Sequence, residues 1–513
     1  MKHDAFDYEG IFPGRASRDR ESAAPIEAWP TKGKLKHFDD PEYVPAPAPA
    51  PLAQTAQKRE PSSSLLTSAG NWIRRRGHTL SFACLFLFSI ILYLRPYELI
   101  PALSSLTSMA FYTGIVTLTV YFGTQLSLEG NLTARPKEIN LIFLLAAAAL
   151  LSMPMADSPA DAWKTFSEML LKTLVIFVVF VNVVRTELRM KMLLLLVLGV
   201  SIYLSISAIN DYRAGVFGFG EMETRRIAGR IKGLFENSND LALHLVTMAP
   251  IAVALGISSR NPLKKLAYFG VTGLMVAAVT VTFSRGGFIG LVAATFVLVR
   301  RLGKKNRVMT IGALVFAVIL FVGFAPGAFS GRISTIFNFG ADVTGSASQR
   351  TEVLKRSFWV MLRYPVFGVG IGNFRHKSPR NLETHNSYTQ VGAELGIAAM
   401  VVYILFLVHP IRRMRLIEKQ SDPKGDQRWY YYLSIGLQAS LVGFMFSSFF
   451  GAVAYQWYVY YLVGYAVCLH RLHIMKFPPA DGFARERWEA PFSKKTQKLI
   501  GGDTVTGTEP AQV

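Results

Sequence analysis

Two arginine-containing segments of the sequence have the residue types of a phosphate-binding site. The first is Arg230-Ile-Lys-Gly-Leu-Phe-Glu-Asn-Ser-Asn239, the second is Thr282-Phe-Ser-Arg-Gly-Gly-Phe288, and each adjoins an apolar run. Guanidinium stays charged and binds phosphate oxygens bidentately. An arginine between two apolar runs, such as Arg285, usually faces a cavity or a ligand; a side chain that extends to the membrane interface is the alternative. For the asparagines, the alternative is a turn in which Asn239 or Asp240 caps the next helix.

A third segment, Glu383-Thr-His-Asn-Ser-Tyr388, has the residue types of a proton-transfer site. Histidine titrates near neutral pH, so His385 could act as a general base, with a carboxylate and an amide beside it to orient its ring. Glu394 follows shortly afterwards. A purely structural histidine is the alternative. Because no second histidine stands at metal-ligand spacing, we expect no metal and no cofactor.

The sequence argues against nucleotide, nucleic-acid and disulfide chemistry. Gly368-Val-Gly-Ile-Gly-Asn-Phe374 is glycine-rich but lacks the strand–helix context and the spacing of a dinucleotide loop. The formal net charge of +21 comes from basic residues scattered over many short loops, which attraction to anionic membrane lipids explains better than nucleic acid does. Cys84 and Cys468 both fall inside apolar runs, so neither a disulfide framework nor a cysteine metal site is expected.

The elements that must position these residues are apolar runs of membrane-spanning length. The chain is 51% hydrophobic, and its charges are concentrated between the runs. We therefore expect an all-α fold, a polytopic membrane helix bundle of about twelve transmembrane helices of roughly 20 residues each. The predicted spans are 78–95, 103–124, 139–156, 167–184, 190–209, 238–257, 266–284, 286–300, 308–325, 393–411, 430–450 and 453–470.

Lysine and arginine in alternate short loops indicate the orientation. The loops that contain Arg135, Arg185, Arg260, Arg300 and Arg412 are basic, and the positive-inside rule places them in the cytoplasm. An even number of spans then places both termini there. The predicted organisation is a disordered cytoplasmic tail (1–78), nine transmembrane helices (79–325), a long periplasmic loop (326–392), three transmembrane helices (393–470) and a cytoplasmic tail (471–513).

Two loops on the opposite face are basic as well, near 210–237 and 326–392. Long loops escape the positive-inside rule, so a solvated surface is one explanation for any single charge. Two basic loops on the same face are better explained by an anionic ligand.

Together these segments resemble the O-antigen ligase and polymerase superfamily of bacterial membrane glycan transferases. The resemblance covers roughly residues 80–470, and its motifs occur in the order found in the family. The matching pieces are Arg230-x-x-Gly233 with Asn237-x-Asn239, Ser284-Arg285-Gly286, Pro365-x-x-Gly368-x-Gly370-x-Gly372-Asn373, and His385-Asn386-Ser-Tyr388 with Glu394-x-Gly396.

The resemblance implies an enzyme of the bacterial inner membrane. Such proteins transfer a glycan from undecaprenyl diphosphate, at the periplasmic face, to lipid A–core (the ligase branch) or to another lipid-linked repeat (the polymerase branch). It also implies a metal-independent, inverting glycosyltransferase in lipopolysaccharide or exopolysaccharide biosynthesis. Arg230 and Arg285 would hold the diphosphate, and His385 would be the catalytic loop histidine. The residues expected to bind substrate are Arg226, Asn237, Asn239, Glu383, Asn386, Tyr388 and Glu394.

Three questions stay open at this level. The motifs do not separate ligase from polymerase. Arg225 and Arg226 lie just before Arg230, so the arginine that fills the first role is not determined. A polysaccharide flippase or transporter without catalytic activity is the alternative function, although the repeated halves and interrupted helices common in transporters are not evident.

Overall fold

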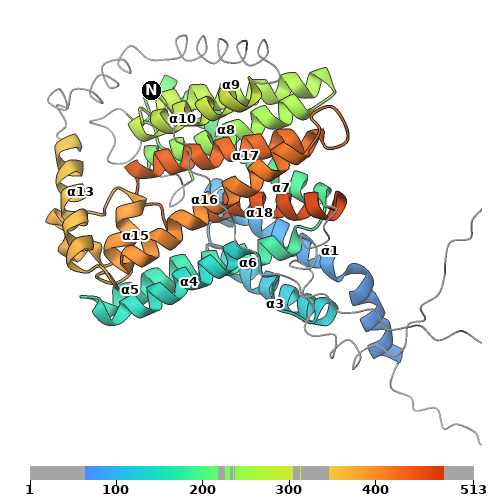
Figure 1. Ribbon diagram of the computed structural model, residues 1–513, viewed down its shortest axis with the longest axis horizontal. Coiled ribbons are helices and arrows are strands. Elements are labelled where there is room, and N and C mark those ends of the chain that lie inside the picture. The colour runs from blue at the N-terminus through green and yellow to red at the C-terminus, as the bar shows by residue number, and fades with distance from the viewer. Residues whose placement is uncertain are drawn as a thin grey trace, which may run out of the picture. The chain divides into compact units, whose positions relative to one another are not determined.

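The computed structural model describes residues 64–217, 226–231, 235, 237–303, 312 and 346–478. They belong to one compact unit, Ser62–Val513. Every regular element within the described residues is a helix, and the long helices pack against one another as a bundle (Figure 1). The all-α class predicted from the apolar runs is therefore confirmed for this part of the chain.

The bundle contains long helices joined by short helical pieces. The long helices are α1 (Ser64–Leu94), α3 (Met109–Glu129), α4 (Lys137–Ser152), α6 (Lys172–Val183), α7 (Glu187–Ala214), α8 (Ser238–Ser258), α9 (Pro262–Val281), α10 (Arg285–Leu302), α13 (Ser346–Arg363), α16 (Ile397–Gln420), α17 (Arg428–Ser447) and α18 (Trp457–Lys476). The short pieces that concern the site are α5 (Pro159–Thr165), the π-helical turn η3 (Phe166–Leu171), α14 (Phe374–Lys377), α15 (Ser387–Leu395) and η6 (Ser448–Phe450).

Eight helical segments among the described residues have the length and composition of a membrane span. They are Gly77–Glu98, Lys137–Met155, Pro159–Val183, Glu187–Ala214, Ser238–Ser258, Pro262–Val281, Ile397–Gln420 and Arg428–Phe450. The predicted spans 103–124, 286–300 and 453–470 correspond to α3, α10 and α18, which are helical but are not among these eight. The predicted span 308–325 lies outside the described residues. The structure thus supports eight of the twelve predicted spans by length and composition.

Some predicted boundaries differ from those of the helices. α1 begins at Ser64, inside the segment 1–78 that was expected to be disordered, because Pro61 is the last helix-breaking proline before it. α18 continues to Lys476, beyond the predicted end at 470. The predicted loop 326–392 is partly helical, since it contains α13 and α14.

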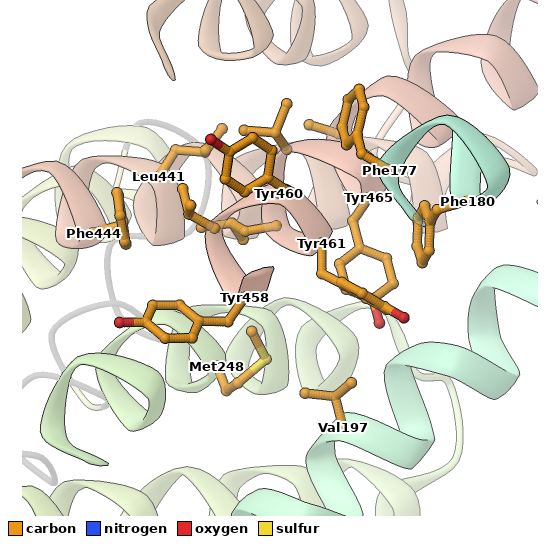
Figure 2. Packing of buried hydrophobic residues seen from close by; sticks show 14 of the residues in the cluster. Phe177, Phe180, Val197, Met248, Leu441, Phe444, Tyr458, Tyr460, Tyr461 and Tyr465 are labelled. Carbon is orange, nitrogen blue, oxygen red and sulfur yellow. The ribbon is translucent and has the colours of Figure 1, made fainter. Parts of the chain in front are cut away.

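Aromatic packing anchors α18 in the bundle. Tyrosines of α18 face phenylalanines of α6 across the core (Figure 2). The ring of Phe180 lies 5.0 Å from that of Tyr461 and 5.1 Å from that of Tyr465, centroid to centroid, both edge-on. A Cβ added to Gly464 would lie 2.8 Å from the Phe180 ring, so glycine allows this close approach. α17, in turn, packs against α8, α10 and α16, and these contacts determine where the α17–α18 connection lies.

Candidate functional site

Asn239 joins the two arginine-containing segments. Its Oδ1 accepts a hydrogen bond from Arg226 Nη2 at 2.7 Å and another from Ser284 Oγ at 2.9 Å. Arg226 Nε also donates to the backbone carbonyl of Thr282 at 3.4 Å. Arg226 is only 8% exposed. A buried guanidinium therefore holds the start of α8 against the residues that precede α10.

The N-cap of α8 is Asn237, and not Asn239 or Asp240 as the sequence suggested. Asn237 Oδ1 accepts from the Asn239 backbone N–H at 2.8 Å. This cap places Asn239 within the first turn of the helix, where its side chain is available to Arg226 and Ser284. Asn237 itself is exposed.

Arg285 is the first residue of α10, directly after a strained bend. Phe283 has a left-handed backbone, with φ of 51°, and is buried. Ser284 caps the helix by accepting from the Gly287 backbone N–H at 3.1 Å. A Cβ on Gly286 would lie 2.7 Å from Phe450 Cβ, so the glycine permits tight packing against η6, which follows α17. The position of Arg285 therefore depends on the bend, the cap and this contact.

Arg230 is held by an acidic partner that sequence reasoning missed. Its guanidinium forms an ion pair with Asp211 of α7, and Arg230 Nε lies 3.0 Å from Asp211 Oδ2. Hydrogen bonding to Asp211 raises the pKa of Arg230. The Arg230 side chain is 56% exposed whereas that of Asp211 is 7% exposed. Arg226 and Arg230 thus differ in their surroundings. Arg230 has the more accessible guanidinium, and Arg226 is the one bound to Asn239.

Asn386 and Tyr388 are used to hold α15 in place. Asn386 Oδ1 caps the helix by accepting from the backbone N–H groups of Tyr388 at 2.9 Å and Thr389 at 3.1 Å. The Tyr388 hydroxyl donates to the Met445 carbonyl oxygen at 2.8 Å. Both residues are buried. Their side chains therefore fix the turn that carries His385.

His385 occupies that turn with a left-handed backbone, φ of 50°. Burial lowers the pKa of His385 below its ordinary 6.5, and the positive charge of Arg350 on α13 lowers it further. A histidine in these surroundings is neutral at pH 7, the protonation state that a general base requires. In the sequence, Arg350 is one of several basic residues of the loop 326–392.

Glu383 and Glu394 form an acidic side of the same region. Burial raises the pKa of Glu394 to about 7, although hydrogen bonds from the Gly372 and Phe374 backbone and from Tyr455 lower it. The Tyr455 hydroxyl lies 2.9 Å from Glu394 Oε2. Glu383 is exposed at the surface, yet the protein atoms around its carboxyl still raise its pKa, an effect that Arg375 partly offsets.

The glycine-rich loop wraps around the backbone of Glu394. The Gly370 N–H donates to the Glu394 carbonyl oxygen at 3.0 Å, and Val369 N–H donates to that of Ala393 at 2.9 Å. Gly368 has φ of 67°, and a Cβ there would lie 2.3 Å from the Glu394 carbonyl. These glycines therefore bring two protein segments together, which agrees with the rejection of a nucleotide loop.

The connection between α17 and α18 joins the arginine segments to α15. Ser447 Oγ donates to the Gly286 carbonyl oxygen at 3.0 Å. Ser387 Oγ donates to the Gly451 carbonyl oxygen at 2.8 Å and accepts from the Val453 N–H at 3.0 Å. Sequence reasoning missed this role of residues 447–453. The available signal was the pair Ser447-Ser448 with Gly451, which interrupts one long apolar run.

The described residues include no group of three or more His, Cys, Asp or Glu side chains able to hold a metal ion. Cys84 and Cys468 are free thiols, far apart in sequence. The arginine side of the site consists of Arg226, Arg230 and Arg285 with Asp211, and its acidic side consists of Glu383 and Glu394 with Arg375 nearby.

Comparison with known proteins identifies part of the chain. Residues 270–404 match the family model described as O-antigen ligase. This segment includes Arg285, the glycine-rich loop, His385 and Glu394, whereas Arg226, Arg230 and Asn239 precede it. No curated protein and no solved structure matched the chain. The match supports the resemblance drawn from the motifs: residues 270–404 are similar to the O-antigen ligase family, within the O-antigen ligase and polymerase superfamily.

Proposed function

We propose that this protein transfers a glycan from undecaprenyl diphosphate to an acceptor saccharide at the periplasmic face of the inner membrane. The observation that carries the proposal is the convergence of the sequence motifs. Asn239 binds the residues that precede Arg285, and residues 447–453 bind both Gly286 and Ser387. The family match supports handling of lipid-linked glycans in general. The acceptor is lipid A–core in a ligase or another lipid-linked repeat in a polymerase.

The arginines supply the electrostatic part of the mechanism. Diphosphate is a good leaving group without protonation, so the reaction needs fixed positive charge where negative charge develops. Arg285 and Arg230 contact the diphosphate, and Arg226 makes a further phosphate contact. The Asn239 and Asp211 contacts hold two of the three guanidiniums in place, which reduces the reorganisation needed when donor binds.

His385 supplies the proton transfer. Its neutral imidazole takes the proton from the acceptor hydroxyl as that oxygen attacks the anomeric carbon. The C–O bond to diphosphate breaks on the opposite face, so the configuration inverts. Glu383 and Asn386 flank the histidine in sequence, and Asn386 holds the turn in which it lies. No metal takes part in this scheme.

We propose that both termini are cytoplasmic and residues 326–392 periplasmic, and ion pairs support the underlying division of the loops between the two faces of the membrane. They join residues that were independently assigned to one side of the membrane. Arg185 pairs with Glu129, and Lys476 pairs with Glu187 at 2.7 Å, all on the proposed cytoplasmic side. On the other side, segments near 157–161 and 375–377 are joined, since Lys377 Nζ lies 2.8 Å from Asp157 Oδ2 and Arg375 Nη2 lies 2.9 Å from Asp161 Oδ2. In the proposal, α3, α10 and α18, together with residues 308–325 outside the described part of the chain, bring the number of spans to twelve.

Transfer by purified protein from a lipid-linked oligosaccharide, with and without acceptor, tests the function. Arg285→Ala should lower the rate by about 10²–10³-fold, because it removes a charge that stabilises the transition state. Arg285→Lys should restore little activity, since an ammonium does not bind phosphate bidentately. Arg300→Ala, at the other end of α10, is the matched control and should be fully active.

Two results would refute the proposal. One is native-like transfer by Arg285→Ala. The other is native protein that moves lipid-linked glycan across a bilayer but transfers nothing to the acceptor, which would favour the flippase.

A further inference from the structure

A cavity of about 270 Å³ lies next to the turn that carries His385. Glu383 and Thr384, the two residues before the histidine, both line it. The other lining residues include Asp161, Lys164, Glu168, Arg375, Glu394 and Gln456. None of the proposed diphosphate-binding arginines is among them. The cavity is therefore chemically distinct from the arginine side of the site.

The cavity wall combines fixed and available polar groups. Arg375 Nη2 is fixed to Asp161 Oδ2 at 2.9 Å, and Tyr455 is fixed to Glu394. By contrast, the side chains of Lys164, Glu168 and Gln456 have no hydrogen-bond or ion-pair partner within the described part of the chain. A rigid wall with unused donors and acceptors is the arrangement expected of a site for a small polar ligand.

The helix that forms one wall is distorted at the cavity. Glu168 and Met169 lie in the π-helical turn η3, between α5 and α6. Such turns are rare, replace regular helical hydrogen bonding and occur frequently at functional sites. His385, beside the cavity, has the left-handed backbone already described. Irregular backbone thus occurs at two separate positions around one cavity.

The charge of the wall limits the ligand. Four of the lining residues are carboxylic acids, and only two, Lys164 and Arg375, are cationic. An excess of carboxylates disfavours a diphosphate or an acidic sugar and favours a neutral or cationic ligand. The volume is just below the roughly 300–1,000 Å³ usual for small-molecule sites, which suits a small polar ring and not a lipid.

We propose that this cavity binds one neutral or amino-substituted sugar ring of the acceptor. Its identification as the acceptor's ring rests on the proposed function. A carboxylate accepts hydrogen bonds from vicinal hydroxyls, and an amide both accepts and donates them. Glu168 and Gln456 are the specificity-determining contacts. The bound ring lies beside His385, so that one of its hydroxyls reaches the base, while the donor diphosphate stays on the arginine side.

Saturation-transfer NMR on the purified full-length protein tests sugar binding without any reaction. The probes are methyl β-D-glucoside, methyl β-D-glucosaminide and methyl β-D-glucuronide, which are respectively neutral, cationic and anionic at pH 7. The first two should show transfer and the third should not. Glu168→Gln combined with Gln456→Ala should weaken binding about 10-fold, the effect expected from loss of one to two hydrogen bonds.

The matched control is Asp157→Asn, an exposed acid near the cavity that does not line it. Its signal with each of the three probes should equal that of the native protein. Equal signals from the three probes, or unchanged binding by the double variant, would overturn the inference.

The outcome for the cavity is separable from that for the function. Arg285→Ala should keep the sugar signals while losing transfer. Sugar binding by a protein that never transfers glycan would leave the cavity assignment intact as a saccharide site and refute the proposed function. If the native protein transfers glycan and the double variant has an unchanged KM for the acceptor, the cavity assignment alone is refuted.

Discussion

The network around Asn239 allows the structural and the electrostatic role of Arg226 to be separated. Asn239→Ala removes two hydrogen bonds, one from Arg226 at 2.7 Å and one from Ser284 at 2.9 Å. A hydrogen bond with a charged partner contributes about 1.5–3 kcal/mol, and one with a neutral hydroxyl about 0.5–1.5 kcal/mol. The expected loss of stability is thus about 2–4.5 kcal/mol. Because Arg226 is only 8% exposed, water replaces the lost bond poorly.

Asn239→Asp should behave differently. The carboxylate has nearly the same shape and accepts both hydrogen bonds, so the free energy of unfolding should stay close to that of the native protein. The carboxylate introduced by Asn239→Asp also places a negative charge against Arg226. This negative charge offsets the positive charge that Arg226 presents to the donor diphosphate. Loss of one charge-assisted phosphate contact, about 1.5–3 kcal/mol, corresponds to roughly 10–100-fold weaker donor binding.

The assay is thermal unfolding of detergent-purified protein at increasing concentrations of undecaprenyl diphosphate. The change in unfolding temperature without ligand reports the stability of the variant. The dependence of the unfolding temperature on undecaprenyl diphosphate concentration reports the affinity for the donor. Asn261→Asp is the matched control, because Asn261 caps α9 by accepting from the Leu263 N–H at 2.9 Å and lies at the opposite end of the bundle in the proposed topology. It makes the same chemical change without touching Arg226.

Two outcomes would refute this reasoning. Native-like donor affinity in Asn239→Asp would show that the charge of Arg226 does not act on the diphosphate. Unchanged stability in Asn239→Ala would show that the hydrogen bonds do not hold the two arginine segments together.

Two further predictions concern pH and topology. The pKa of His385 is lowered by burial and by Arg350, so the transfer rate should fall only as the pH drops through a value below 6.5. Arg350→Ala raises that pKa, and the acid limb of the pH–rate profile should move to higher pH; an unchanged limb would contradict the role of His385 as base. Reporter fusions after Lys265 and Arg415 should be cytoplasmic and a fusion after Arg363 periplasmic. A cytoplasmic reading at Arg363 would place the histidine turn on the wrong side for a periplasmic reaction.

Much of the bundle was predictable because helix formation in a membrane is mainly a local property. An apolar run of sufficient length satisfies its backbone hydrogen bonds internally, whatever its neighbours are. The predicted spans near 139–156, 190–209 and 238–257 therefore recur as α4, α7 and α8. Helix ends were less predictable, as the cap of α8 at Asn237 shows, since several adjacent polar residues compete for the same role.

The residue types of the candidate site were also readable from the sequence. Arg285 and His385 were conspicuous because charged and titratable side chains are costly beside apolar runs and need a reason to be there. The order of the motifs pointed to the family that residues 270–404 then matched. None of this required knowledge of which helices touch.

The tertiary structure alone decided which groups act on these residues. Asp211 of α7 pairs with Arg230 in the segment before α8, and the charge of Arg350 on α13 acts on His385 in the turn before α15. The cavity likewise combines η3, α15 and the α17–α18 connection, and Asn373 Oδ1 accepts from the Ser158 N–H at 2.8 Å across 215 positions of sequence. Such contacts result from how side chains fill the space between helices, and no local pattern encodes that geometry. The sequence thus determined the helices and the chemistry available to them, whereas packing decided the partners and therefore the protonation, charge and shape of the site.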